Sequence, residues 1–140
     1  MQTFAQERLL TELDHVRLTK LVERAQRDAV LAHPNAEIED LLDSAEVVPA
    51  RQIGADVVTM YSQVELIDAD SAARSRLTLC YPADADPPAG FVSILSPVGA
   101  ALLGLRVGAL ARWHEPSGRA RAARVLGIAF QPEASGDYTM

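Results

Sequence analysis

The residues best suited to hold a metal ion are four carboxylates close together in the first third of the chain: Glu37, Glu39, Asp40 and Asp43. Oxygen ligands of this kind are those that Mg²⁺ prefers, often shared with a phosphate substrate. Glu37 and Asp40 are three residues apart and would share one face of a helix. Acids in the first turn of a helix also complement the helix dipole without any ligand. The dipole interpretation is the simpler one, and the metal interpretation stays open beside it.

The histidines and the cysteine show no pattern of a catalytic or metal site. His15, His33 and His114 lie far apart, and none has metal-pair spacing to another histidine, a cysteine or a carboxylate. Cys80 has no basic neighbour to stabilise a thiolate, so we interpret it as a small buried thiol. A single cysteine excludes an internal disulfide and fits a reducing compartment. We expect no catalytic residue, no metal, no cofactor and a cytoplasmic location.

Composition and charge exclude several classes of protein. The chain has 140 residues, 49% of them hydrophobic and 23% charged, which is typical of a globular domain. Its net charge of −6 argues against a general nucleic-acid binder, so we expect no sequence-specific nucleic-acid binding. The sequence contains neither an apolar run of about 18 residues nor a basic-then-apolar leader, which predicts no membrane span and no export. Residues 1–50 carry five cationic and ten acidic side chains, against eight and nine in residues 51–140.

The acidic first third has the periodicity of two helices. Thr11 and Asp14 resemble a capping box that opens the first helix. Its apolar stripe is Leu18, Leu21, Val22, Ala25, Ala29 and Ala32, and the stripe of the second helix is Ile38, Leu41, Leu42 and Ala45. The turn between them is His33, Pro34 and Asn35. These stripes predict a short antiparallel helical hairpin (a coiled coil) over residues 1–46, with Glu37 and Asp40 beside its tip.

The rest of the chain has the period of β-strands. Pro49 lies in a predicted linker, residues 47–53, and a second domain is predicted over residues 54–140. Strands are predicted around 64–66 and 77–81 and over 91–95, 109–114 and 120–130. Between the third and fourth of these, Ser96 is the expected cap and Pro97 the first residue of a short apolar helix. Gly104 ends this helix, and Gly108 forms a turn.

These elements predict an α+β protein with an antiparallel, twisted sheet of about five strands, one face of which is covered by the short helix. On the last strand Leu126, Ile128 and Phe130 face the same way. Trp113 and Phe130 are predicted to lie in the core, because the scattered aromatic residues form no cluster elsewhere.

Four stretches of the chain resemble one protein family. They are ADVVTMYSQV (55–64), LTLCYP (77–82), SILSPVGAALLGLRVG (93–108) and VLGIAFQPEASGDYTM (125–140). The chain is similar over residues 11–140 to the Rnk family (regulator of nucleoside diphosphate kinase), part of the GreA/GreB transcription-elongation factor superfamily. The SPVGAALLG block marks the superfamily, and the QPEASGDY tail narrows the resemblance to the Rnk type.

The resemblance implies an FKBP-like topology for the second domain and bacterial RNA polymerase as the partner. In this superfamily that domain docks on the rim of the polymerase secondary channel, through a corner that ends in Ser-Pro. Here the corner is Leu95, Ser96 and Pro97, followed by Val98. Gre proteins often carry an acidic residue where this chain has Leu95, which is a departure from the pattern. An apolar residue beside an exposed proline still makes a contact surface.

The resemblance also implies a difference in activity. Gre factors stimulate transcript cleavage by placing carboxylates at the hairpin tip beside the catalytic Mg²⁺ of the polymerase. Here the turn has no carboxylate, the nearest being Glu37, and an arm of about 20 residues is only about 30 Å long. Catalysis through a metal-held water tolerates little misplacement. We therefore expect binding and competition with Gre-type factors, without stimulation of cleavage.

Two alternatives belong to other classes. A Gre-like cleavage factor would use Glu37 and Asp40 as metal helpers. An FKBP-like peptidyl-prolyl isomerase would need a cluster of aromatic residues to bind proline, whereas three Phe, three Tyr and one Trp are scattered along this chain. Fold alone does not establish such an activity.

Overall fold

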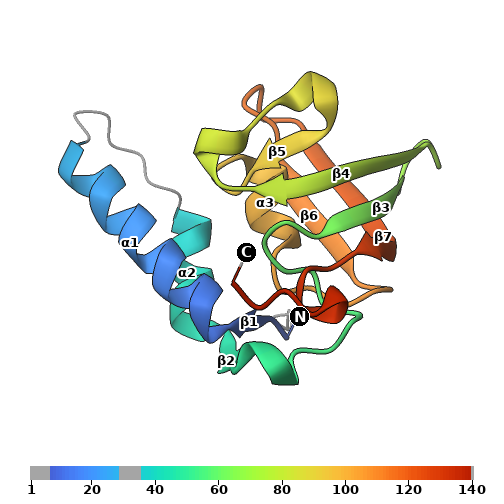
Figure 1. Cartoon of the computed structure of the whole chain (residues 1–140). Coiled ribbons are helices and arrows are strands. Elements are labelled where there is room, and N and C mark those ends of the chain that lie inside the picture. The colour runs from blue at the N-terminus through green and yellow to red at the C-terminus, as the bar shows by residue number, and fades with distance from the viewer. Residues whose placement is uncertain (1–6, 29–35, 140) are drawn as a thin grey trace.

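The computed structural model describes residues 7–28 and 36–139. Two helices, α1 and α2, lie beside a curled sheet that carries a third, short helix, α3 (Figure 1). The α+β class predicted from the sequence is confirmed. None of the described helices is both long and apolar enough to cross a membrane.

The first helix begins where its capping residue predicts. α1 (Glu12–Asp28) follows Thr11, whose hydroxyl oxygen accepts a hydrogen bond from the backbone N–H of Asp14 at 3.0 Å. α2 (Ala36–Ser44) packs against α1. Leu18 of α1 and Ile38 of α2 are fully buried, so these members of the predicted apolar stripes face the core. The predicted tip residues His33, Pro34 and Asn35 lie outside the described residues.

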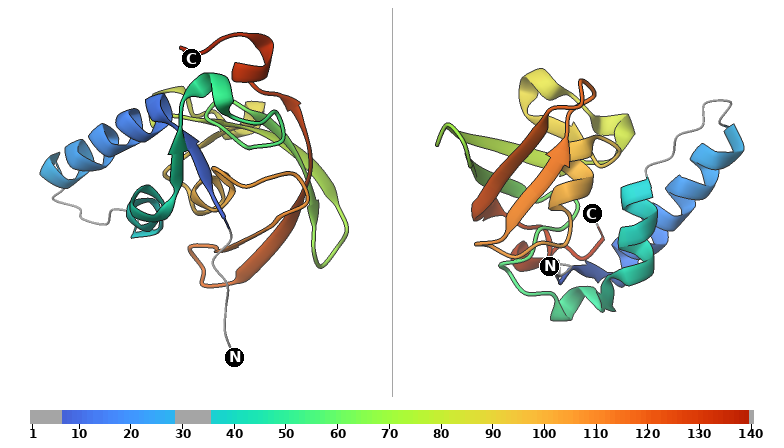
Figure 2. Two further views of the ribbon diagram at one scale, coloured as in Figure 1. Left: turned by 90° about the horizontal axis from the view of Figure 1, so that it is seen from below. Right: turned by 180° about the vertical axis from the view of Figure 1, so that it is seen from behind.

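A two-stranded parallel sheet joins the base of the two helices. β1 (Leu9–Thr11) leads into α1, and β2 (Glu46–Val48) follows α2, with Leu10 opposite Val47. The segment predicted as a linker contains the last two residues of β2 and a 3-10 turn, Ala50–Gln52. Figure 2 shows this pair of strands between the helices and the main sheet.

The main sheet has five strands in the order β5-β4-β3-β7-β6. Their bounds are β3 Gln63–Asp68, β4 Arg74–Cys80, β5 Phe91–Ser93, β6 Leu110–His114 and β7 Ala120–Phe130. The sheet is mixed, so the prediction of an antiparallel sheet was wrong: β5 runs parallel to β4. The reason is the connection over residues 81–90, which contains two 3-10 turns. This connection is long enough to bring the chain back beside β4, so that β5 runs in the same direction as β4.

The last strand presents its residues differently from the prediction. Phe130 is 40% exposed and Leu126 is 39% exposed, whereas Ala123 and Val125 are buried. The prediction of Phe130 as a core residue was therefore wrong. The pairing of β3 with β7 is shifted at two points, between Gln63 and its neighbour Val64 and again two residues later. Such bulges change which residues of a strand face the core.

One continuous core joins the helices to the sheet. Its members include Leu18 and Ile38 from the two helices, Val64 and Leu79 from the sheet, and Leu102 from α3 (Pro97–Leu102). Burial of this apolar surface holds the two-helix unit against the sheet. The helices therefore contribute to the same core as the strands.

Candidate functional site

The corner between β5 and α3 is held by a compact set of hydrogen bonds. The hydroxyl of Ser96 donates to the carbonyl of Ser93 at 2.6 Å and accepts from the backbone N–H of Gly99 at 3.1 Å. Ser96 is thus the N-cap of α3, as predicted, and Pro97 occupies its first turn. Pro97 is exposed, whereas Leu95 and Val98 are partly buried and pack against the core. The structure brings the four predicted docking residues together at one corner.

The buried Gly99 allows the backbone of α3 to pack closely against the end of β5, beneath the corner. A Cβ added at this position would lie closer than 3.0 Å to the carbonyl oxygen of Ser93 and 3.0 Å from the Cα of Ile94. The backbone of α3 therefore lies directly on the backbone that ends β5, and no larger residue fits there without a shift.

Arg8 closes the other end of α3. Its Nη1 donates to the carbonyl of Leu103 at 2.8 Å and to that of Ala100 at 3.2 Å. Burial lowers the pKa of this guanidinium from its ordinary value. A cation at the C-terminal end of a helix satisfies carbonyls that lack an intrahelical partner. The N-terminal segment thus holds α3, and with it the corner, from a distance of more than 90 residues along the chain.

We expect Arg8→Leu to lower the free energy of unfolding by about 1–2 kcal/mol, because two helix carbonyls lose a charged donor. Urea unfolding followed by circular dichroism measures the change. Arg106→Leu is the matched control, since Arg106 makes an exposed ion pair with Glu7 at 3.3 Å and should change stability by less than about 0.5 kcal/mol. Equal effects of the two substitutions would contradict a special role for Arg8.

A groove on the sheet lies beside the corner, with Val98 among its lining residues. Its apolar wall includes Leu66, Leu77 and Trp113. Trp113 is the one aromatic residue among the described residues that line it, so the groove does not present the aromatic cluster that a prolyl isomerase would need. The groove therefore lies next to Pro97, because the neighbouring Val98 lines it.

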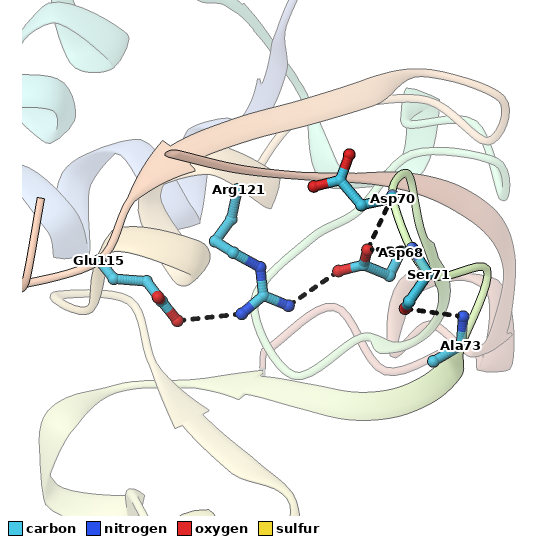
Figure 3. A network of polar contacts seen from close by, with 6 residues as sticks. All are labelled: Asp68, Asp70, Ser71, Ala73, Glu115 and Arg121. Atoms are coloured by element: carbon cyan, nitrogen blue, oxygen red, sulfur yellow. Dashed lines mark hydrogen bonds and ion pairs between the residues drawn. The ribbon is translucent and has the colours of Figure 1, made fainter. Parts of the chain in front are cut away.

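An ion network borders this groove (Figure 3). The Arg121 guanidinium bonds to Asp68 at 2.8 Å and to Glu115 at 3.0 Å, so it ties the β3–β4 turn to the end of β6. The other oxygen of Asp68 accepts from the backbone N–H groups of Asp70 and Ser71. These N–H groups and Arg121 hold the pKa of the Asp68 carboxyl well below its usual range.

The predicted acidic residues of α2 lie elsewhere. Glu37 and Asp40 line a separate groove between α2 and the sheet, together with Arg8 and Arg112. The structure does not bring them to the corner of residues 95–98. Among the described residues, no group of three or more His, Cys, Asp or Glu side chains could hold a metal ion.

Asp14 of α1 is a buried acid with a strongly raised pKa. It is 1% exposed, and its Oδ2 accepts a hydrogen bond from the backbone N–H of Met60 at 3.2 Å. The pKa of this carboxyl is raised to about 7, mainly by burial and also by the nearby Glu133, against opposing effects of the Met60 N–H, Thr11 and Arg17. Asp14 therefore connects the first turn of α1 to the loop that precedes β3.

The C-terminal tail also packs on this loop. Glu133 is 8% exposed and accepts a hydrogen bond from the Thr59 hydroxyl at 2.7 Å. Burial raises the pKa of Glu133. Gln131 donates to the carbonyls of Gly54 and Val57, each at 2.8 Å. Further along the tail, the carbonyl of Thr139 accepts from Arg17 of α1 at 3.0 Å, so residues 131–139 connect this loop to the helices.

The burial of Asp14 has a signal in the sequence beyond its motif. Asp14 precedes the buried Leu18 by one helical turn, and the spacing i, i+4 puts both on the same face of α1. The capping box already explains why an acid stands at the start of the helix, so the motif alone gives no reason to expect that Asp14 is buried. No comparable signal marks Glu133, because it lies in a polar stretch without periodicity.

Comparisons with known proteins agree with this architecture. Residues 53–130 match the family model described as "Transcription elongation factor, GreA/GreB, C-term". The chain is 39% identical over 134 residues to the "Regulator of nucleoside diphosphate kinase" of Escherichia coli K12, which covers 94% of this chain and 96% of that protein. It is also 32% identical over 96 residues to transcription elongation factor GreA of Beijerinckia indica, over 69% of this chain and 60% of that protein.

A solved structure is similar as well. The GreA/GreB prokaryotic transcription elongation factor from Nitrosomonas europaea superposes with a TM-score of 0.72 at 37% identity, over 89% of this chain and 100% of that chain. The match of sequence and fold extends over the helices and the sheet alike. The chain therefore belongs to the GreA/GreB transcription elongation factor family and, within it, to the Rnk type.

Proposed function

We propose that this protein is a non-catalytic regulator of bacterial transcription that binds RNA polymerase at the rim of the secondary channel. In this proposal the corner Leu95–Val98 makes the contact, and the two-helix unit of α1 and α2 points into the channel entrance. The protein occupies the entrance, competes with Gre-type factors and does not stimulate transcript cleavage. The β-rich unit is FKBP-like in topology, and the protein acts in the cytoplasm.

The observation that carries the docking part is the construction of the corner. Pro97 is exposed on a backbone that Ser96 caps from one side and Gly99 supports from below. A contact residue on a rigid support loses little entropy on binding. Membership of a family of transcription elongation factors makes the transcription machinery the natural partner for such a surface.

The length of the helices and the position of the acids support the absence of cleavage activity. The described part of α1, Glu12–Asp28, corresponds to about 25 Å at the usual helix rise. The matched GreA protein has 40% of its length outside the aligned part. Glu37 and Asp40 are exposed and line a groove with Arg8 and Arg112, away from the corner of residues 95–98.

The test is a competition on stalled elongation complexes made with purified RNA polymerase. Transcript cleavage is recorded with this protein alone, then with GreA or GreB and increasing amounts of it. We expect no cleavage by the protein alone and dose-dependent inhibition of the Gre factor. Cleavage by the protein alone would support the alternative in which Glu37 and Asp40 help the polymerase metal, and an absence of inhibition would contradict occupation of the channel.

A substitution at the corner separates docking from folding. Pro97→Glu places a charge on the exposed surface at a helix position that accepts an acid, and it leaves the Ser96 cap intact. We expect it to raise the concentration needed for half-inhibition about ten-fold or more, as for an interface contact at the centre of a small patch. Pro116→Glu, at another exposed proline, in the β6–β7 turn, should leave the inhibition unchanged. Equal inhibition by both variants would exclude the corner as the docking site.

A further inference from the structure

A cleft between α1 and the segment after β4 combines an apolar floor with a cationic rim. Its lining residues are Arg17, Lys20, Leu21, Arg24, Tyr81, Pro82 and Ala83. The cleft has a volume of about 510 Å³, within the range of about 300–1,000 Å³ that small-molecule sites occupy. It is separate from the corner of residues 95–98, none of which lines it.

Three of the lining residues are cations, although the protein has a net charge of −6. Arg17, Lys20 and Arg24 follow each other along one face of α1, over about 10 Å of helix. None of them forms an ion pair with a carboxylate among the described residues; the ion pairs there involve other arginines. Arg17 donates to the carbonyl of Thr139, a neutral group that leaves its positive charge in place. Lys20 and Arg24 are exposed.

Two acids lie near this cleft but do not line it. Asp14 is 1% exposed and is absent from the lining residues. Asp84 accepts a hydrogen bond from the neutral hydroxyl of Tyr61, which leaves its negative charge in place, and it is also absent from the lining residues. The cleft therefore presents three cations and no lining carboxylate among the residues that the structure describes.

The floor is aromatic at one end. The rings of Tyr61 and Tyr81 pack at a centroid distance of 5.8 Å with a tilt of 58°, which fixes the Tyr81 ring in place. The Tyr81 hydroxyl oxygen is buried and has no hydrogen-bond partner among the described residues. Burial raises the pKa of this hydroxyl, so it remains a hydrogen-bond donor. Pro82 beside it is exposed and apolar.

We propose that this cleft binds a free nucleoside 5′-triphosphate, with the base against Tyr81 and Pro82 and the phosphates along Arg17, Lys20 and Arg24. Charge complementarity selects the phosphates, because arginine and lysine donate several charge-assisted hydrogen bonds to phosphate oxygens. The aromatic and apolar floor selects the base, since every base has a flat face that stacks on a tyrosine ring. An acidic peptide would satisfy the rim but would leave the aromatic floor unused.

The test measures binding of ATP and GTP to the purified full chain by isothermal titration calorimetry in low salt. We expect saturable binding at one site. The variant Lys20→Glu/Arg24→Glu should weaken it about ten-fold or more, because two phosphate contacts become repulsions. The control Arg74→Glu/Arg119→Glu changes the net charge equally, at exposed positions away from the cleft, and should alter the affinity less than about two-fold. Equal weakening in both variants would show non-specific charge attraction and overturn the proposal.

Two further ligands separate the sources of affinity. Inorganic triphosphate should bind at least several-fold more weakly than ATP; equal binding would exclude a contribution from the base. A short single-stranded RNA with a free 3′ end should bind more weakly than the free nucleotide per site. Binding of the RNA without binding of nucleoside triphosphates would overturn the assignment of a free nucleotide. Neither result depends on RNA polymerase, so this proposal and the docking proposal can fail separately.

Discussion

Replacing Asp14 by asparagine is expected to remove much of the pH dependence of stability between about pH 5 and 7. Asp14 is 1% exposed, and burial raises the pKa of its carboxyl in the folded protein to about 7, from 3.8 for a free side chain. An asparagine oxygen can still accept the hydrogen bond from the Met60 N–H, which Asp14 accepts at 3.2 Å. The variant therefore keeps the contact and loses the charge.

The direction of the pH effect follows from the two pKa values. Between about pH 4 and 7 the unfolded chain has released the proton of Asp14, whereas the folded protein still holds it. The folded state binds more protons in this window, so the free energy of unfolding falls as the pH rises and levels off above about 7. Each unit of pKa difference corresponds to about 1.4 kcal/mol, which gives a total effect of a few kcal/mol. The raised pKa of Glu133 acts in the same direction.

Urea unfolding at several pH values measures this effect. Wild-type stability should decline from pH 5 to pH 7, and Asp14→Asn should be more stable than wild type at pH 8 by about 2 kcal/mol or more. Asp40→Asn, which changes an exposed carboxylate of α2, is the control and should follow the wild-type profile. If Asp14→Asn and wild type gave parallel profiles, Asp14 would not be the titrating group. Below about pH 4 stability should fall again, because the unfolded chain then takes up the proton of Asp68, whereas the lowered pKa keeps this carboxylate charged in the folded protein.

Gly99→Ala is expected to destabilise the protein by about 2–4 kcal/mol, although alanine is the better helix former. The added Cβ would collide with the carbonyl oxygen of Ser93 and the Cα of Ile94, and it would lie 3.1 Å from a methyl group of Leu79. Two of these neighbours are backbone atoms, so no change of rotamer relieves the collision. α3 must move away from β5, and the corner Leu95–Val98 moves with it.

The matched control is Gly127→Ala in β7. There the nearest atom to an added Cβ is a carboxylate oxygen of Glu65 at 3.6 Å, an ordinary contact. Its expected effect is small and can be stabilising, because alanine restricts the unfolded chain. The urea midpoints of unfolding of the two variants give the comparison. In the competition assay, Gly99→Ala should inhibit the Gre factor more weakly than wild type, whereas Gly127→Ala should inhibit it as wild type does. Identical midpoints for the two variants would show that α3 has more freedom than its packing indicates.

The sequence predicted those features that depend on local chemistry. Thr11 and Ser96 both cap the helices that they were expected to start. A hydroxyl at this position can accept a hydrogen bond from a backbone N–H of the first turn, which has no partner within the helix. The strands were located by alternation, and β6 and β7 match their predicted ranges to within one residue. Gly104 adopts the expected left-handed conformation, with φ of +84°.

Features that depend on distant parts of the chain could not be predicted in this way. The parallel pairing of β4 with β5 leaves the alternation of residues in either strand unchanged. The exposure of Phe130 follows from bulges between β3 and β7 that no single strand reveals. The bonds from Arg8 to α3 span more than 90 residues, and nothing near Arg8 indicates them.

The C-terminal tail has a consequence for the order in which the molecule is completed during synthesis. Residues 131–139 emerge from the ribosome after the residues to which they bond elsewhere in the fold, among them Gly54, Val57 and Thr59, and Arg17 of α1. Until then, the nascent chain lacks the hydrogen bonds that Gln131 donates to the carbonyls of Gly54 and Val57 and that Glu133 accepts from the Thr59 hydroxyl. The helices and strands can form earlier from their own contacts. The bonds from this tail to the loop and to Arg17 therefore form only after the segments that they join have been synthesised.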